Sequence, residues 1–102
     1  MSHGWSADDK GIAKVAAERA RRRADQEAIA LHAAYKINSI DDLWALELKI
    51  RQWRKDRQHR FTLNFQRANE QLAAWLSRGW LLESDLTRMS PERVNKIKPK
   101  KT

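Results

Sequence analysis

The chain has 102 residues, of which 41% are hydrophobic and 33% charged, so we expect one small domain over residues 1–102 and no two-domain enzyme. The 21 Lys and Arg outnumber the 13 Asp and Glu, for a net charge of +8 that favours anionic partners. The absence of cysteine excludes disulfides and thiolate metal sites and favours a reducing cytoplasm. The longest apolar run is about five residues, which argues against a membrane span.

The scarcity of helix breakers predicts an all-α fold built from long helices. Glycine occurs 3 times and proline 2 times, and none of these residues lies between Gly11 and Gly79. The first helix is expected over residues 7–37, because Ser6 followed by Asp9 resembles a capping box. Small side chains then recur at spacings of three or four, a pattern that permits close approach of another helix. This alanine stripe consists of Ala13, Ala17, Ala20, Ala24, Ala28, Leu31 and Tyr35.

A second helix is expected over residues 40–58, where Ser39 with Asp42 repeats the cap arrangement. Large apolar residues recur along it at spacings of three, four and three, which places them on one face. A chain of this size cannot cover that face alone, so we predict an elongated homodimer in which two such faces meet. This apolar seam, the expected dimer interface, consists of Leu43, Leu46, Ile50 and Trp53. Trp44 lies one position off the seam and is a candidate contact for a partner.

The last part of the chain is expected to form a small helical head over residues 61–97. A shift in the phase of the apolar pattern near Phe61 predicts a break between residues 58 and 62, after which the helical spacing resumes. Gly79 is expected to end a helix in the left-handed conformation. Residues 98–102 have nothing to bury and should fray.

Residue patterns that carry catalysis or bind metals are missing from the sequence. The three histidines, His3, His32 and His59, fall in separate segments with no partner at metal or triad spacing. The adjacent aspartates stand at predicted helix starts, where the helix dipole favours negative charge. We therefore predict a protein that is not an enzyme and holds neither a metal nor another cofactor.

Basic residues concentrate in three segments, which raises nucleic-acid binding as an alternative function. Residues 10–23, 49–60 and 93–102 each carry a net charge of +5. Such segments could follow a phosphate backbone, with Trp53 or Phe61 beside them to stack bases. The competing interpretation is a set of solvated helix faces.

Residues in the second half of the chain also keep a distinctive spacing, without a gap from Asp42 to Ile97. They are Ile40, Asp41, Asp42, Leu43, Trp44, Ala45, Leu46, Arg54, Gly79, Trp80, Leu81, Asp85, Leu86, Lys96 and Ile97. With these residues, residues 35–97 of the chain resemble the fluorescence recovery protein family. Its members are small all-α cyanobacterial proteins that dimerise through long helices, carry a C-terminal helical head and speed the return of photoactivated orange carotenoid protein to its resting form.

The resemblance implies a protein-binding role without a cofactor. It assigns Trp44 and Arg54 to contact with the partner and Leu43 to the dimer interface. The family has a histidine and an aspartate shortly after that tryptophan, whereas this chain has Glu47 and Leu48, which we include among the candidate partner contacts. The implied partner is the orange carotenoid protein or, given these departures and the basic excess, another and acidic protein.

Overall fold

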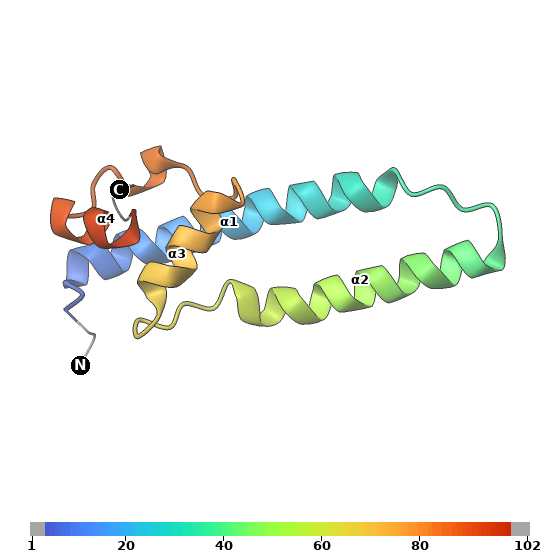
Figure 1. Cartoon of the computed structure of the whole chain (residues 1–102), viewed down its shortest axis with the longest axis horizontal. Coiled ribbons are helices and arrows are strands. Elements are labelled where there is room, and N and C mark those ends of the chain that lie inside the picture. Colours follow the sequence, from blue (N-terminus) through green and yellow to red (C-terminus); the bar gives the residue numbers. More distant parts are fainter. Residues whose placement is uncertain (1–3, 99–102) are drawn as a thin grey trace.

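The computed structural model of the chain describes residues 4–98, apart from the side chain of Gln58. The elements are, in order, α1 (Ala7–Ala33), α2 (Ile40–Arg60), α3 (Ala68–Ser77), the 3-10 helix η1 (Glu83–Leu86) and α4 (Pro91–Ile97). No β-strand occurs within this range, which confirms the all-α prediction. Helices α1 and α2 form a long antiparallel hairpin, and α3, η1 and α4 gather as a head on the first part of α1 (Figure 1). The molecule measures 53 × 28 × 24 Å.

Helix α1 begins where the capping pattern predicts and ends earlier than expected. The Ser6 hydroxyl oxygen accepts a hydrogen bond from the Asp9 backbone N–H at 3.1 Å. The helix stops at Ala33 rather than at Ile37. Ser39 caps α2 in an extended conformation, with φ of −148°. Residues 34–39 therefore form a non-helical connection between α1 and α2.

Helix α2 is capped as predicted and runs slightly further than residue 58. The Ser39 hydroxyl accepts a hydrogen bond from the Asp42 backbone N–H at 3.1 Å, and the Asp42 carboxylate accepts one from the Asn38 N–H at 3.0 Å. The helix ends at Arg60, and Phe61 follows with φ of −104° and ψ of 8°. The predicted break is therefore confirmed, close to its expected place.

The segment over residues 61–67 is not helical, so the expected helical start of the head at residue 61 is wrong. Helix α3 begins only at Ala68. The Asn64 side chain accepts a hydrogen bond from the Gln66 N–H at 3.0 Å, and the Gln71 side chain accepts one from the Asn64 N–H at 2.9 Å. These side chains satisfy backbone groups that a helix would pair within itself, which stabilises a loop despite the helical spacing of the apolar residues.

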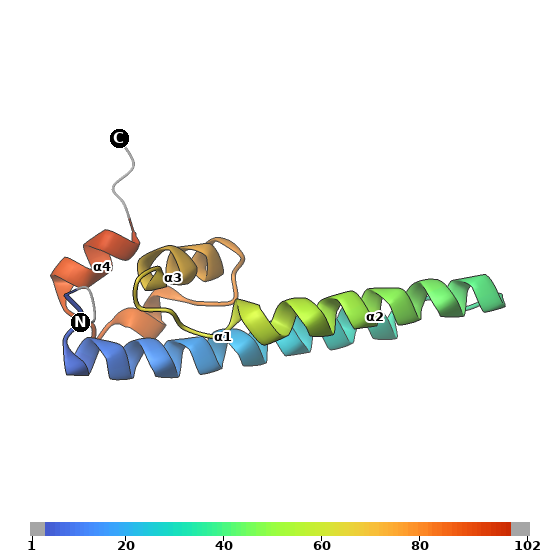
Figure 2. The ribbon, with the colours of Figure 1, turned by 90° about the horizontal axis from the view of Figure 1, so that it is seen from below.

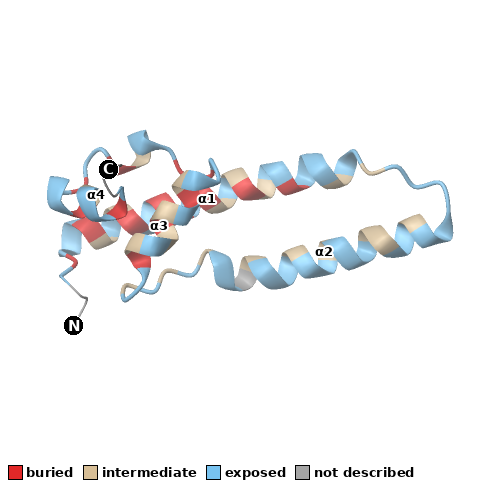
Figure 3. Cartoon of the chain, in the orientation of Figure 1, coloured by how far each residue is buried: buried red, intermediate tan, exposed pale blue. Residues whose placement is uncertain are grey.

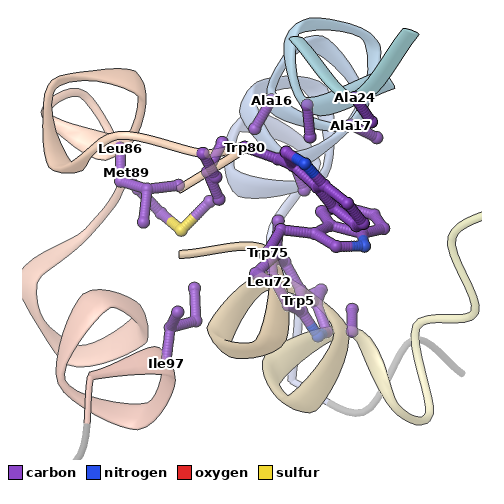
Figure 4. Close-up of a cluster of buried hydrophobic side chains, with 14 residues drawn as sticks. Trp5, Ala16, Ala17, Ala24, Leu72, Trp75, Trp80, Leu86, Met89 and Ile97 are labelled. Atoms are coloured by element: carbon purple, nitrogen blue, oxygen red, sulfur yellow. The ribbon is translucent and has the colours of Figure 1, made fainter. Parts of the chain in front are cut away.

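The core lies between the alanine stripe of α1 and the large side chains of the head. The buried positions, red in Figure 3, follow α1 only where the head covers it. Buried on α1 are Ala13, Ala16, Ala17, Ala20, Ala24 and Ala28. All of these alanines except Ala28 share one core cluster with Trp5, Leu72, Trp75, Trp80, Leu81, Leu86, Met89 and Ile97 (Figure 4). The small side chains on α1 allow the tryptophans of the head to approach its backbone closely.

The alanine stripe continues past the region that the head covers. Leu31 is 65% exposed and Tyr35 is half-buried, so the last two residues of the stripe are not part of the buried core. Ala28 is the last residue of α1 that is buried. The rest of the stripe consequently faces solvent in the single chain.

Two carboxylates fasten the head to α1. Asp9 accepts hydrogen bonds from the backbone N–H of Ser90 at 2.9 Å and from its hydroxyl at 2.7 Å. Asp85 accepts hydrogen bonds from Arg23 at 2.6 Å and from Arg19 at 3.0 Å. Burial disfavours the charged form of both, but these hydrogen bonds outweigh it and hold the pKa of each carboxyl below its usual value.

The predicted left-handed glycine is present, and a short helix closes the described part of the head. Gly79 has φ of +77° and follows the end of α3. Helix α4 begins with Pro91 in its first turn. Lys98, which was expected to begin the frayed tail, forms an ion pair with Glu83. The rest of that predicted tail, residues 99–102, lies outside the described range.

Candidate protein-binding surface

The apolar seam remains largely uncovered in the single chain. Leu46, Ile50 and Trp53 are half-buried, and Leu43 is 44% exposed. None of the α2 residues whose side chains the structure describes is buried, as the pale and tan ribbon of Figure 3 shows. The structure thus gathers the four predicted seam residues on one helix without supplying a cover for them.

Aromatic and cationic side chains link the two arms of the hairpin. The Trp53 ring packs edge-on against the His32 ring, with 6.4 Å between the ring centroids. The Lys49 ammonium lies 4.9 Å from the centroid of the Tyr35 ring. Within α2, the Arg57 guanidinium lies 5.8 Å from the centroid of the Trp53 ring, one helical turn away. Part of the Trp53 surface is therefore covered by α1, so Trp53 is less available to a second chain than the rest of the seam.

A bidentate ion pair closes the hairpin near the head. The Arg57 Nε donates to one oxygen of Asp25 at 2.7 Å, and its terminal nitrogen donates to the other oxygen at 3.0 Å. This hydrogen bonding from the guanidinium holds the pKa of the Asp25 carboxyl below its usual value, against a smaller opposing effect of burial. The pair fixes the position of α2 relative to α1, and so orients the seam.

The predicted partner contacts lie on the exposed side of α2. Trp44 is 59% and Leu48 52% exposed, and they are one helical turn apart on the same face. Glu47 and Arg54 are also exposed, two turns apart, and lie between that face and the seam. Glu47 forms an ion pair with Arg51 along the helix. The predicted partner contacts and the seam thus occupy neighbouring faces of one helix.

Most of the large exposed apolar residues belong to the end of α1, the connection that follows it and the first turns of α2. They are Ile29, Leu31, Ile37, Ile40, Leu43, Trp44 and Leu48. This end of the hairpin, the hairpin tip, lies far from the head (Figure 1). The sequence pattern singled out neither Ile29 nor Ile37. The signal that could have found them is their position on both sides of the turn around Asn38, where two helix ends bring apolar residues together. A clustered apolar surface of this kind marks a site of protein association.

Groups that could hold a metal ion were sought among the acidic and imidazole side chains of residues 4–98. No three of them approach one another closely enough for that purpose. His3, one of the three histidines weighed from the sequence, falls outside this range.

No helix within the described part of the chain is both long and apolar enough to cross a bilayer.

Comparisons with known proteins agree with this arrangement. The sequence matches the family model described as photoprotection regulator fluorescence recovery protein over residues 5–100. No curated protein matches the sequence significantly. The solved structure of the Fremyella diplosiphon Fluorescence Recovery Protein superposes on this fold with a TM-score of 0.81 at 21% identity, covering 93% of this chain and 95% of that chain. The chain belongs to the fluorescence recovery protein family of photoprotection regulators.

Proposed function

We propose that this chain is a non-enzymatic regulator that binds orange carotenoid protein as a homodimer and speeds its return from the photoactivated to the resting form. The observation that carries the proposal is the exposed apolar tip of the hairpin, with Trp44 at its centre, in a chain of this family. A regulator of this kind needs no catalytic group. It acts by binding one conformer of its partner more tightly than the other.

The homodimer is supported by surfaces that the single chain leaves open. The seam on α2 and Leu31 at the end of the alanine stripe are apolar and lie on facing arms of one hairpin. A second hairpin, packed against the first, would cover both at once. A two-fold arrangement of this kind makes every contact twice, which suits a chain that can bury only part of its apolar surface alone.

The partner contacts we propose are Trp44 with its neighbours Glu47, Leu48 and Arg54. Tryptophan and arginine are the side chains most enriched at the energetic centres of interfaces. Glu47 and Leu48 stand where the family carries a histidine and an aspartate. They would adapt the surface to the sequence of its own partner, which is either the orange carotenoid protein or a different, acidic protein.

The test is the recovery of photoactivated orange carotenoid protein, followed by its absorbance in the dark with and without the purified chain. We expect the chain to speed recovery. Trp44→Ala should weaken partner binding by about thirty-fold, because it removes the largest exposed apolar side chain of the surface. The variant should therefore need a correspondingly higher concentration to produce the same recovery rate.

Val15→Ala is a suitable control, because Val15 is 53% exposed but belongs to the head end of α1. It should leave the recovery rate unchanged. A wild-type chain that fails to bind orange carotenoid protein would contradict the proposal and leave an acidic protein as the partner to seek. An equal loss of recovery rate in Trp44→Ala and Val15→Ala would contradict the proposal that the hairpin tip binds the partner.

A further inference from the structure

A second surface, separate from the hairpin tip, lies where α2 meets the head. A groove of about 510 Å³ opens between the end of α2, the following loop and α3. Its lining includes His59, Arg60, Asn64, Arg67, Gln71 and Ala74, and none of the described residues that line it is acidic. We call this the neck groove.

Arg60, which lines the neck groove, and Arg78, at the end of α3, both contact one aromatic ring. The guanidinium of Arg60 lies 5.2 Å from the centroid of the Trp80 ring, and that of Arg78 lies 4.4 Å from it. Cation–π contacts therefore position both side chains before any ligand arrives. The ring itself is buried and fixed, since its N–H donates to Glu27 at 3.2 Å and Phe61 packs on it with 5.5 Å between centroids.

Neither of these arginines is neutralised by an ion pair with a carboxylate of residues 4–98, whereas those that fasten the hairpin and the head are. Arg57 pairs with Asp25, and Arg23 pairs with Asp85. Arg67, at the other side of the groove, has only a loose contact of 3.6 Å with Glu70 and is 73% exposed. Arg60 and Arg67 line one groove whose described lining holds no acidic side chain, so Coulomb attraction would favour an anion bound there.

The chemistry of the neck groove suits a phosphate backbone better than unpaired bases. Guanidinium groups bind phosphate through two parallel hydrogen bonds. Stacking of bases requires exposed rings, but Trp75 and Trp80 are buried, and Phe61 is half-buried against both of them. The expectation that Phe61 or Trp53 stacks bases is therefore not supported, and sequence-independent contact with phosphates remains.

From this geometry we infer that the neck groove binds the phosphate backbone of nucleic acid through Arg60, Arg78 and Arg67. Lys49, Arg54 and Lys55 on α2 add positive charge before the groove, whereas Arg51 and Arg57 of the same segment are paired with Glu47 and Asp25. Binding of this kind is independent of base sequence and falls steeply as salt rises, because each contact releases a condensed counterion. The inference does not depend on the carotenoid-protein proposal, whose main contact, Trp44, lies near the other end of α2.

The test is fluorescence anisotropy of a labelled DNA duplex titrated with the full chain at several salt concentrations. For the wild type, the slope of log affinity against log salt reports about 0.9 per phosphate contact. Arg60→Gln combined with Arg78→Gln should weaken binding by about ten-fold or more and lower that slope by about two. Arg22→Gln combined with Arg88→Gln, which removes two exposed arginines away from the groove, should change neither quantity appreciably.

A second pair of variants separates lost charge from lost folding. Arg60→Lys combined with Arg78→Lys keeps both charges, so it should retain most of the salt dependence that the glutamine pair loses. The inference fails if the lysine pair binds as weakly as the glutamine pair, or if the control pair loses as much affinity as the groove pair. It also fails if poly-L-glutamate displaces the labelled duplex as effectively as unlabelled duplex of equal total charge does, since the groove would then bind acidic proteins. Trp44→Ala should bind the duplex normally.

Discussion

Gly79 determines how the chain leaves α3 and returns to the core. The Trp80 N–H donates to the Trp75 carbonyl at 3.0 Å, and the Gly79 N–H donates to the Leu76 carbonyl at 3.1 Å, which together form a Schellman motif. The motif requires a left-handed residue, and Gly79 supplies it with φ of +77°. The same turn delivers the Trp80 ring to the alanine stripe of α1.

Gly79→Ala should therefore lower the free energy of unfolding by about 1 kcal/mol, because alanine is strained in the left-handed region. No atom lies within 4 Å of the added Cβ, so a steric clash adds nothing to this effect. Thermal unfolding followed by circular dichroism should show a melting temperature lower by about 4–8 °C.

The matched control is Gly11→Ala, which also meets nothing within 4 Å but lies inside α1. It should raise the free energy of unfolding by about 0.5–1 kcal/mol, because alanine favours the helix. Two glycine-to-alanine changes in one chain are thus expected to have opposite signs. A stabilised Gly79→Ala variant would show that the turn does not need left-handed backbone.

At the level of elements, local signals predicted helix starts better than helix partners. The side chains of Ser6 and Ser39 each accept a hydrogen bond from the backbone N–H three residues later, so both helix starts could be predicted from the local sequence. The loop over residues 61–67 was missed, because its stability comes from side chains that compete with the helix. Trp5 was left unassigned, since its burial against Phe65 and Arg93 depends on distant elements.

The attachment of η1 to α1 rests on one carboxylate and provides a prediction about pH. Asp85 accepts hydrogen bonds from Arg19, Arg23 and the Leu82 N–H, and its side chain is only 3% exposed. Asp85→Asn should lower the free energy of unfolding by about 2 kcal/mol at neutral pH, because it removes charge-assisted hydrogen bonds. Urea unfolding measures this difference.

The difference should shrink in acid. The folded-state pKa of Asp85 is lowered, so its contribution is complete above the unfolded-state value of about 3.9 and is lost as pH falls through the folded-state value. At about pH 3 wild type and variant should therefore lie closer together than at neutral pH. Asp56→Asn, which removes an exposed carboxylate from α2, should stay within about 0.5 kcal/mol of wild type at both values. A constant difference across this range would exclude the ion pairs as its source.

At the level of the whole molecule, the chain divides into an end with a core and an end without one. The head and the first part of α1 contain the buried side chains of the described range, while the hairpin tip carries most of its large exposed apolar ones. The seam spacing predicted an apolar face on α2, and in the single chain that face is half-buried at three positions and exposed at Leu43, while the dimer expected to cover it stays a prediction. The sequence could not show that the head would pack on α1, because alanines specify close approach without specifying a partner.

Leu43→Glu tests the proposed dimer, since two-fold symmetry would place two added charges in one apolar interface. The dimer should weaken by about 100-fold, and size-exclusion chromatography at micromolar concentration should show a monomer. Gln52→Glu adds the same charge at an exposed α2 position outside the seam and should remain dimeric. Dimers that persist in Leu43→Glu would place the interface elsewhere.

The lack of buried residues along α2 has a consequence for recognition. A helix that buries no side chain gains little from tertiary packing, and its order rests on intrinsic propensity, two ring contacts and the Asp25–Arg57 pair. Local opening of α2 therefore requires much less free energy than opening of the head. The candidate binding surface lies on the helix that opens most easily. A molecule that binds there must also keep α2 helical, and the free-energy cost of ordering α2 will lower the measured affinity.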